Sequence, residues 1–348
     1  MIMFKKYIIS DEASVFDALK AINNIGNRDA LTLFVVDSSN SVVGTLTDGD
    51  IRRSLIEGKT LDDRVGQVAH KNFIYLTFGN YSVETIHIAR NKDIELLPVL
   101  DNQMKIRDVV NLKKQKSYLP IDAVLMAGGK GERLRPLTEK IPKPLLKVGD
   151  KCIIDYNVDR LISYGVRHIS VTVNYLREQL EEHFAEPREN VQVKTVREPK
   201  FLGTIGSIKF VETFYNDTVL LMNSDLFTNI DYEDFFLHFK EHDADMSVAA
   251  IPYTVSVPYG IFELDGREVK GVLEKPTYNY YANSGIYLIK RDLLNLIPNG
   301  KFFNATDFID LLMKNGYKVI RFPLNGTWID IGNPQEYQKA KELAKHLK

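Results

Sequence analysis

The feature that most constrains the fold is an apolar segment that leads directly into a glycine-rich loop. Residues Ile121–Met126 are mostly apolar, and Gly128, Gly129 and Gly131 follow at once. Glycine lets a loop turn with positive φ and brings backbone N–H groups close to an anion. The pattern therefore predicts a phosphate-binding turn at the end of a buried strand. Cations that suit a bound phosphate follow at Arg133, Arg135 and Lys143.

Beyond this loop, segments that favour strands alternate with segments that favour helices. Such alternation predicts an α/β fold with a Rossmann-like, mostly parallel sheet and helices on both faces. Ligands of such folds bind at the carboxyl ends of the strands. The expected strands are Ile121–Met126, His168–Val173, Val191–Thr195, Thr218–Asp225 and Asp245–Tyr253, and the expected helices lie near Cys152–Tyr164 and Leu176–Phe184.

Length and composition exclude several classes of protein. The 348 residues suggest at least two domains, and a net charge of −1 with 44% hydrophobic residues is ordinary for a soluble protein without a nucleic-acid partner. No apolar run approaches the roughly 20 residues that span a bilayer, and the N-terminus lacks a signal-peptide pattern, so we expect a cytoplasmic protein with no membrane partner. Cys152 is the only cysteine, which excludes an internal disulfide.

An internal repeat occupies the N-terminal third of the chain, with a shift of about 64 to 68 residues. Ser82-Val83 repeats Ser14-Val15, and Asp101 corresponds to Asp37. The first copy is expected to run helix, strand, turn, strand, helix. This pattern resembles a tandem pair of cystathionine-β-synthase-type (CBS) modules, which implies an α+β fold. We expect the modules at residues 1–115, a linker at 116–120 and a catalytic domain at 121–348.

The CBS resemblance leaves two roles open for the N-terminal region. In that family the cleft between modules often binds a purine nucleotide, and Thr47 and Asp50 are the residues here that the resemblance places against phosphate and ribose. Lys114 stands where the second module would need an equivalent of Asp50, so one of the two sites lacks its acid. The alternative is a role in packing and dimerisation alone, with Asp50 capping a helix.

The glycine loop belongs to neither of two common nucleotide motifs. Leu134 replaces the third glycine of a dinucleotide fingerprint, and no Gly-Lys-Ser/Thr ending of a Walker loop is present. The whole string Leu125–Leu146 resembles the signature of the sugar-1-phosphate nucleotidyltransferases, and the resemblance covers about two thirds of the chain. Supporting motifs follow at Phe201–Ser207, Asn223–Asp225, Tyr259-Gly260, Glu274–Pro276, Asn283–Tyr287 and Trp328–Gly332.

This resemblance implies transfer of a nucleotidyl group from a nucleoside triphosphate to a sugar 1-phosphate, with Mg²⁺ as cofactor. Two anionic phosphates must meet, so cations and a metal ion are needed to offset their repulsion. The implied catalytic residues are Arg133, Lys143, Asp225 and Lys275. The implied metal ligands are Asp225 and Asp330, whose hard oxygens suit Mg²⁺. The implied nucleotide site contains Leu125, Ala127, Gly128, Gly129, Gly131, Glu198, Gly203 and Thr204, and the implied sugar site contains Tyr259, Gly260, Glu274 and Asn283.

Glu198 bears on the choice of base. Relatives that use uridine or thymidine triphosphate commonly have glutamine there, whereas a carboxylate offers only acceptors, which suit the N1–H and N2–H₂ donors of guanine. We therefore expect GTP as the donor. Because paired CBS modules often dimerise and the nucleotidyltransferases that this chain resembles are commonly oligomeric, we also expect a homo-oligomer. The alternatives are a cytidylyl-, uridylyl- or thymidylyltransferase acting on a sugar or alcohol phosphate, and a catalytically inactive nucleotide sensor.

Overall fold

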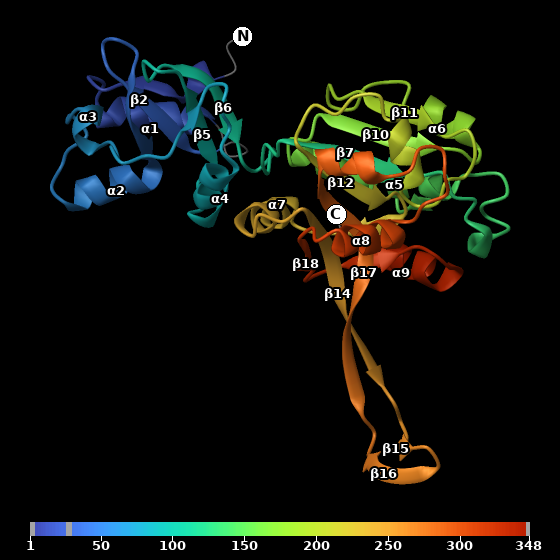
Figure 1. The fold of residues 1–348 in the computed structure, drawn as a ribbon. Helices are drawn as coiled ribbons and strands as arrows, with labels where there is room; N and C mark the ends of the chain where they lie inside the picture. The colour runs from blue at the N-terminus through green and yellow to red at the C-terminus, as the bar shows by residue number, and fades with distance from the viewer. Residues whose placement is uncertain (1–3, 26–29, 346–348) are drawn as a thin grey trace. The chain divides into compact units, whose positions relative to one another are not determined.

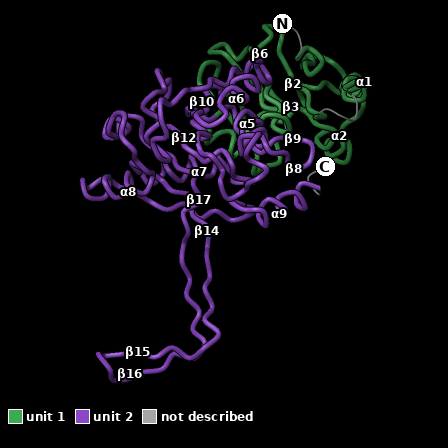
Figure 2. The backbone as a smooth tube through the Cα atoms, turned by 90° about the vertical axis from the view of Figure 1, so that its right-hand side faces the viewer, with its two compact units in different colours: residues 1–118 green, residues 119–348 purple. Residues whose placement is uncertain are grey.

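The structure is a computed structural model that describes residues 4–25 and 30–345. The chain divides into two compact units after Tyr118, within the expected linker range of 116–120 (Figure 2). None of the helices in residues 4–25 and 30–345 has the length and apolar character needed to cross a membrane.

Unit 1 contains two three-stranded sheets with the same topology. In the orders β1-β2-β3 and β4-β5-β6, the first pair of strands is parallel and the second pair is antiparallel. The predicted repeat is therefore present in the fold as well as in the sequence. The elements are η1 (Lys5–Tyr7), β1 (Ile8–Ser10), α1 (Val15–Ile25), β2 (Thr32–Val36), β3 (Val42–Thr47), α2 (Asp48–Ile56), α3 (Val65–Val68), β4 (Leu76–Thr77), α4 (Val83–Asn91), β5 (Leu96–Leu100) and β6 (Ile106–Asn111).

The turns of the two sheets repeat the same hydrogen bonds. One carboxylate oxygen of Asp37 accepts from two backbone N–H groups of the β2–β3 turn, and one of Asp101 does the same in the β5–β6 turn. Aspartate commonly fixes a turn in this way. The equivalence that the sequence predicted between these two residues is confirmed. The donors are Ser39 and Ser41 for Asp37, and Gln103 and Lys105 for Asp101.

Unit 2 is built on a seven-stranded sheet with the order β11-β10-β7-β12-β17-β14-β18. Every neighbouring pair is parallel except the two that involve β17 (Figure 1). The expected mostly parallel sheet is confirmed. The strands are β7 (Ile121–Met126), β8 (Lys147–Val148), β9 (Lys151–Cys152), β10 (His168–Val173), β11 (Val193–Arg197), β12 (Thr218–Asn223), β13 (Leu226–Thr228), β14 (Met246–Ser256), β15 (Ile261–Asp265), β16 (Glu268–Leu273), β17 (Thr277–Lys290), β18 (Val319–Pro323) and β19 (Trp328–Asp330).

Helices cover both faces of this sheet, as its central strands require. Alternate residues of β7 point to opposite faces, and all from Ile121 to Leu125 are buried. Val124 packs with Phe308 of α8 on one face, whereas Met222 accepts a hydrogen bond from Tyr232 of α7 on the other. The helices are η2 (Glu132–Leu134), η3 (Lys143–Leu145), α5 (Ile153–Ser163), α6 (Arg177–His183), η4 (Gly206–Phe210), α7 (Tyr232–Glu241), η5 (Arg291–Leu296), α8 (Ala305–Lys314) and α9 (Pro334–Ala344).

Two strands of the sheet continue far beyond it and form an arm, which we define as residues 251–282. The outer parts of β14 and β17 stay paired from Ala250↔Asn283 to Ser256↔Thr277, and the hairpin β15–β16 lies at the far end (Figures 1 and 2). No residue of the arm is buried. The sequence predicted the strand Asp245–Tyr253 but neither its extension nor this hairpin.

Candidate active site

The glycine loop lies at the carboxyl ends of the parallel strands, where the topology predicts a ligand site. It begins directly after β7 and turns at Gly131, which has φ +63° and caps the 3₁₀ helix η2. The carbonyl of Gly131 accepts a hydrogen bond from the Thr138 hydroxyl at 2.8 Å, which ties the loop to its own return segment. This return segment continues to Lys143, which lines the site.

Lys143 joins two acids from distant parts of the chain. It is 8% exposed, and its Nζ donates to Asp225 and lies 3.8 Å from Asp330 Oδ1. The short strands β13 and β19 pair Leu226 with Asp330, which holds the two carboxylates side by side. The Arg133 guanidinium lies beside Gly332, at the end of the same segment. Loop, strand end and C-terminal segment thus meet at one cluster of charge.

The pair of carboxylates fits a divalent cation. Asp225 Oδ1 is buried and has no hydrogen-bond partner, although a buried carboxylate oxygen is costly to leave unpaired. Burial and the neighbouring charge of Asp225 raise the pKa of Asp330 above its ordinary value. A cation between the two acids would pair with Asp225 Oδ1 and offset the repulsion between the two carboxylates. Asp225 and Asp330 are therefore the residues that would hold a metal ion in this site.

Glu198 lies against Gly128 of the glycine loop. It is 2% exposed, and its Oε2 accepts a hydrogen bond from the Leu202 N–H at 3.1 Å. A Cβ atom on Gly128 would lie 1.7 Å from Glu198 Oε1, so only glycine fits beside this carboxylate. Burial raises the pKa of Glu198. Its second oxygen thus faces the loop in a setting that favours a ligand with hydrogen-bond donors.

These groups line a cavity of about 640 Å³ at the sheet edge. Most of the predicted nucleotide-site residues line it. Leu125 does not, because its side chain is fully buried inside the sheet. Asp330 does not line the cavity either, but it lies beside Asp225 and 3.8 Å from Lys143 Nζ. The predicted residues that line the cavity are Ala127, Gly128, Gly129, Gly131, Arg133, Lys143, Glu198, Gly203, Thr204 and Asp225.

Asn174 is a polar residue of the cavity that was missed at the level of sequence. Asn174 directly follows β10, as Ala127 follows β7, so its place at a strand end was the available signal. Asn174 donates a hydrogen bond to the Glu198 carbonyl at 3.3 Å. Asn223 ends β12 and lies against Gly285 of β17. The rule that ligands gather at strand ends would have identified Asn174, whereas Asn223 already belongs to the predicted motif Asn223–Asp225.

The four predicted sugar-site residues do not line the cavity in this structure, although they were expected to complete the same site as the glycine loop. Tyr259, Gly260, Glu274 and Lys275 lie on the arm, and none of them lines the cavity. They do lie together, since a Cβ on Gly260 would be 3.1 Å from Glu274 Oε2. Asn283 lies at the root of the arm and accepts from the Gly285 N–H at 2.9 Å. The paired ladder of β14 and β17 is the physical reason for the separation, because it keeps the arm extended.

In unit 1, Thr47 and Asp50 form a capping box at the start of α2. Asp50 Oδ2 accepts from the Thr47 N–H at 2.8 Å and from its hydroxyl at 2.7 Å, and Arg53 donates to Asp50 Oδ1 at 2.6 Å. Both carboxylate oxygens of Asp50 therefore have partners within the helix end. The ribose contact remains a prediction.

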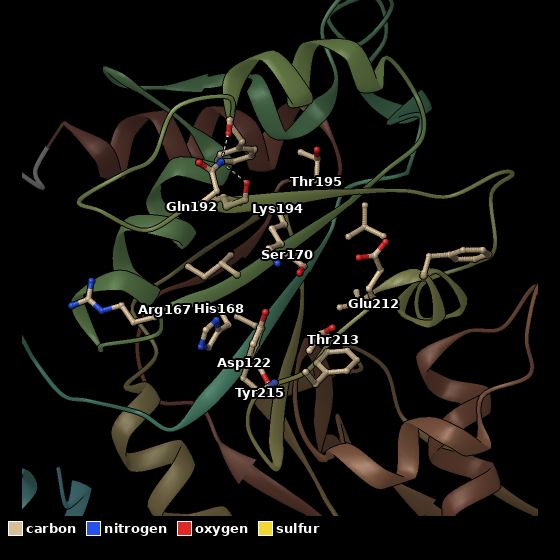
Figure 3. Close-up of a pocket in the computed structure, with 18 of the residues that line it drawn as sticks. Asp122, Arg167, His168, Ser170, Gln192, Lys194, Thr195, Glu212, Thr213 and Tyr215 are labelled. Atoms are coloured by element: carbon tan, nitrogen blue, oxygen red, sulfur yellow. Dashed lines mark hydrogen bonds between the residues drawn. The ribbon is translucent and has the colours of Figure 1, made fainter. Parts of the chain in front are cut away.

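A second cavity, of about 680 Å³, lies along β10 and β11 (Figure 3). None of Lys143, Asp225 and Asp330 lines it. Its buried carboxylate, Asp122, accepts from the N–H groups of Tyr215 and Asn216 at 2.8 Å each, so it holds a loop in place. The His168 ring stacks on Tyr215 at 4.0 Å. Asp122 and His168 therefore stabilise the loop that contains Tyr215.

A mostly parallel sheet, a glycine loop at its carboxyl edge and a lysine between two acids define a nucleotide-binding α/β protein that acts on phosphate groups. The profile of the family described as nucleotidyl transferase matches residues 122–346, and the chain belongs to this family. Members of the family generally use a divalent metal. The CBS domain profile matches residues 2–57.

Individual relatives are identical to this chain at about a quarter of the aligned positions. The chain is 27% identical over 224 residues to mannose-1-phosphate guanyltransferase beta-B of Xenopus laevis, and the match covers 62% of each chain. A UTP–glucose-1-phosphate uridylyltransferase of Synechocystis is 26% identical over 63% of this chain and 62% of its own. The crystal structure of HddC from Yersinia pseudotuberculosis matches with TM-score 0.52 and 27% identity, over 64% of this chain and 99% of HddC. HddC has also been crystallised with GMP-PN. The chain thus spans less than two thirds of the length of the curated relatives.

Proposed function

We propose that the chain transfers GMP from GTP to a sugar 1-phosphate and releases pyrophosphate, with Mg²⁺ as the metal. The observation that carries this proposal is the placement of Lys143 between Asp225 and Asp330, beside the glycine loop. Such a site is suited to hold a triphosphate and a metal ion together. The membership of the chain in the nucleotidyl transferase family supports the same reaction.

In the proposed reaction an oxygen of the sugar phosphate forms a bond to the α-phosphorus of GTP. The bond from that phosphorus to the oxygen bridging to the β-phosphorus breaks, and pyrophosphate leaves with that oxygen. We assign the loop N–H groups of Gly129 and Gly131 and the Arg133 guanidinium to the departing pyrophosphate. Lys143 neutralises the reacting phosphates, since a buried ammonium group offsets charge more strongly than an exposed one.

Asp225 and Asp330 would hold Mg²⁺, which would neutralise triphosphate oxygens when bound. The unpaired Asp225 Oδ1 supports this assignment. Until a metal binds, Lys143 provides the counter-charge for both acids. The lysine therefore keeps the two carboxylates in place for the cation.

Glu198 supports guanine as the base. One carboxylate oxygen is held by the Leu202 N–H, and the other lies beside Gly128 in the cavity. This buried acceptor suits the adjacent N–H donors of guanine and offers no donor to the carbonyl oxygens of uracil. The match to a guanyltransferase and the GMP-PN complex of HddC are consistent with this choice.

The proposal is tested by pyrophosphate release from a panel that pairs GTP, CTP, UTP and dTTP with hexose, aminohexose and heptose 1-phosphates and with phosphocholine. We expect release with GTP and at least one sugar 1-phosphate. Release with phosphocholine and CTP alone would favour the alcohol-phosphate alternative. No release with any pair would favour the nucleotide sensor.

For unit 1 the capping box favours the structural role over nucleotide binding, because both carboxylate oxygens of Asp50 already accept hydrogen bonds within the helix end. Equilibrium dialysis of the full chain with labelled AMP and ATP tests this assignment. Saturable binding that disappears in Asp50→Ala but persists in Lys114→Ala, a change at the corresponding position of the second copy, would support the nucleotide site instead.

A further inference from the structure

The arm leaves unit 2 at the edge of the sheet that carries the cavity, and the paired strands β14 and β17 extend it away from the sheet. Strand β14 runs parallel to β12, so its outward end emerges at the carboxyl edge, next to Asn223. The ladder continues without a break from Ala250↔Asn283 to Ser256↔Thr277, and Val257 donates to the Pro276 carbonyl at 3.0 Å. At about 3.3 Å per residue this ladder holds its far end about 20 Å beyond the sheet.

The hairpin at the end of the arm has an uncovered apolar face. Phe262 pairs with Val272, and Leu264 pairs with Val269. Their side chains are 61%, 57%, 62% and 54% exposed, in that order. An isolated two-stranded hairpin is at best marginally stable, and an exposed apolar face marks an interaction surface. The arm therefore needs a surface to pack on.

The cavity of the same chain lacks a group that the proposed reaction requires. All three cationic residues among the described residues that line it, Lys130, Arg133 and Lys143, come from the glycine loop and its return segment. The acceptor brings its own phosphate, which needs a second source of positive charge. Lys275 lies at the base of the hairpin beside Glu274, which could bond to sugar hydroxyls, and both are exposed.

The rim of the cavity offers a surface that complements the hairpin. Phe201 lines the cavity and is 52% exposed, and Phe302 beside it is 57% exposed. The two rings meet edge to face at 5.9 Å. An apolar hairpin face and an exposed aromatic pair are mutually suited, yet the paired ladder keeps the arm of one chain away from its own rim.

We propose that two copies of this chain exchange their arms, so that the end of each arm packs on the cavity rim of the other copy and delivers Lys275 and Glu274 to it. The exchange is closed by a two-fold axis, since each copy gives one arm and receives one. The active site is then composed of residues from both copies. The assignment of Lys275 to the acceptor phosphate rests on the proposed function, whereas the exchange of arms is a separate structural claim.

Complementation between two defective variants tests the shared site. One chain carries Lys143→Ala in its body, and the other carries Glu274→Ala with Lys275→Ala in its arm. The two are co-expressed with different affinity tags, and the mixed dimer is purified through both tags. With exchange, the intact body receives the intact arm, so one of the two sites works and activity should reach about half of the wild-type value. Residual activity no higher than that of the two parent variants would overturn the proposal.

A cross-linking experiment tests the exchange without relying on catalysis. In a Cys152→Ser background, which removes the only native cysteine, Phe201→Cys and Tyr259→Cys are placed on the same full-length chain and oxidised. Exchange predicts a disulfide-linked dimer on a non-reducing gel. An internally linked monomer would show that the arm folds back, and no disulfide at all would overturn the placement of the arm at the rim.

Light scattering supplies the matching control. The wild-type chain is expected to be a dimer, and Phe262→Ser with Val272→Ser is expected to shift it to monomer by removing the apolar face. Wild-type protein that is monomeric at assay concentration and fully active would contradict the exchange. A dimer in which pyrophosphate is never released, but in which the disulfide forms, would contradict the proposed reaction while leaving the exchange supported.

Discussion

The loop side and the arm side of unit 2 carry the two halves of the proposed chemistry, and they are held by different kinds of structure. On the loop side, Glu198 and Asp225 follow strand ends, Lys143 begins the 3₁₀ helix η3, and all three are packed within one unit. On the arm side, Glu274 and Lys275 lie on an exposed hairpin joined to the sheet by a two-stranded ladder. The loop side is thus built by local topology alone, whereas the arm side needs a surface that it does not itself contain.

The largest effect is expected at the buried lysine of the loop side. Lys143→Ala removes the charge between the two acids and should lower kcat about a hundredfold or more, since losing one such group costs about 3 kcal/mol in the barrier. Steady-state pyrophosphate release measures this. The matched control is Lys140→Ala, because that lysine is exposed on the same segment. Equal losses in both variants would contradict the role of Lys143.

The two neighbouring glycines of the loop give a second matched pair. A methyl group at Gly128 would collide with Glu198 Oε1 at 1.7 Å, whereas nothing lies within 4 Å of one at Gly129. Gly128→Ala should therefore raise KM for GTP by about tenfold or more, because the carboxylate must leave its buried place. Gly129→Ala should have little effect on KM. Similar KM values for both variants would show that Glu198 does not contact the nucleotide.

Replacing the lysine of the arm should affect the binding of the sugar 1-phosphate and not that of GTP. Lys275→Ala should raise KM for the sugar 1-phosphate by about tenfold, the value of one hydrogen bond to a charged group, and leave KM for GTP unchanged. Lys270→Ala is the control, because Lys270 lies on the same hairpin and already pairs with Glu268. If Lys275→Ala raised only the KM for GTP, Lys275 would act on the nucleotide, and the assignment of the acceptor phosphate to the arm would be contradicted.

The smallest effect is expected in the pH dependence set by Glu198. Its pKa is raised by burial, and guanine donors require the ionised carboxylate, so kcat/KM for GTP should fall as the pH drops through this raised pKa. Glu198→Gln cannot titrate and should flatten this limb of the profile while shifting preference from GTP towards UTP. Profiles of both enzymes with both triphosphates measure it. An unchanged limb and an unchanged base preference in Glu198→Gln would refute the assignment.

Much of the loop side was predictable because it follows from rules that act over short stretches of sequence. The strands Ile121–Met126 and His168–Val173 have the predicted bounds, and β11 is displaced by two residues towards Arg197. Asp225 was predicted at the end of a strand and lies just after β12, and Glu198 directly follows β11. Asn174 obeys the same rule but was overlooked, because a single asparagine carries no motif of its own.

The arm was not predictable for a physical reason. Phe262, Leu264 and Val272 have the alternation of a half-buried strand, and a sequence shows that such a face must be covered without showing by what. The motifs at Tyr259-Gly260 and Glu274-Lys275 indicated chemistry but not position. Their place depends on the unbroken pairing of β14 with β17, which is a property of two segments separated by twenty residues or more.

The central claim, that the cavity transfers a nucleotidyl group, is tested most directly by following labelled phosphorus from GTP in the wild-type reaction. With the label on the α-phosphorus, the account predicts that it appears in a nucleotide sugar. With the label on the γ-phosphorus, it predicts that all of it appears in pyrophosphate. An α-label that ends in free GMP or GDP, or a γ-label that is transferred to the sugar phosphate, would contradict the account.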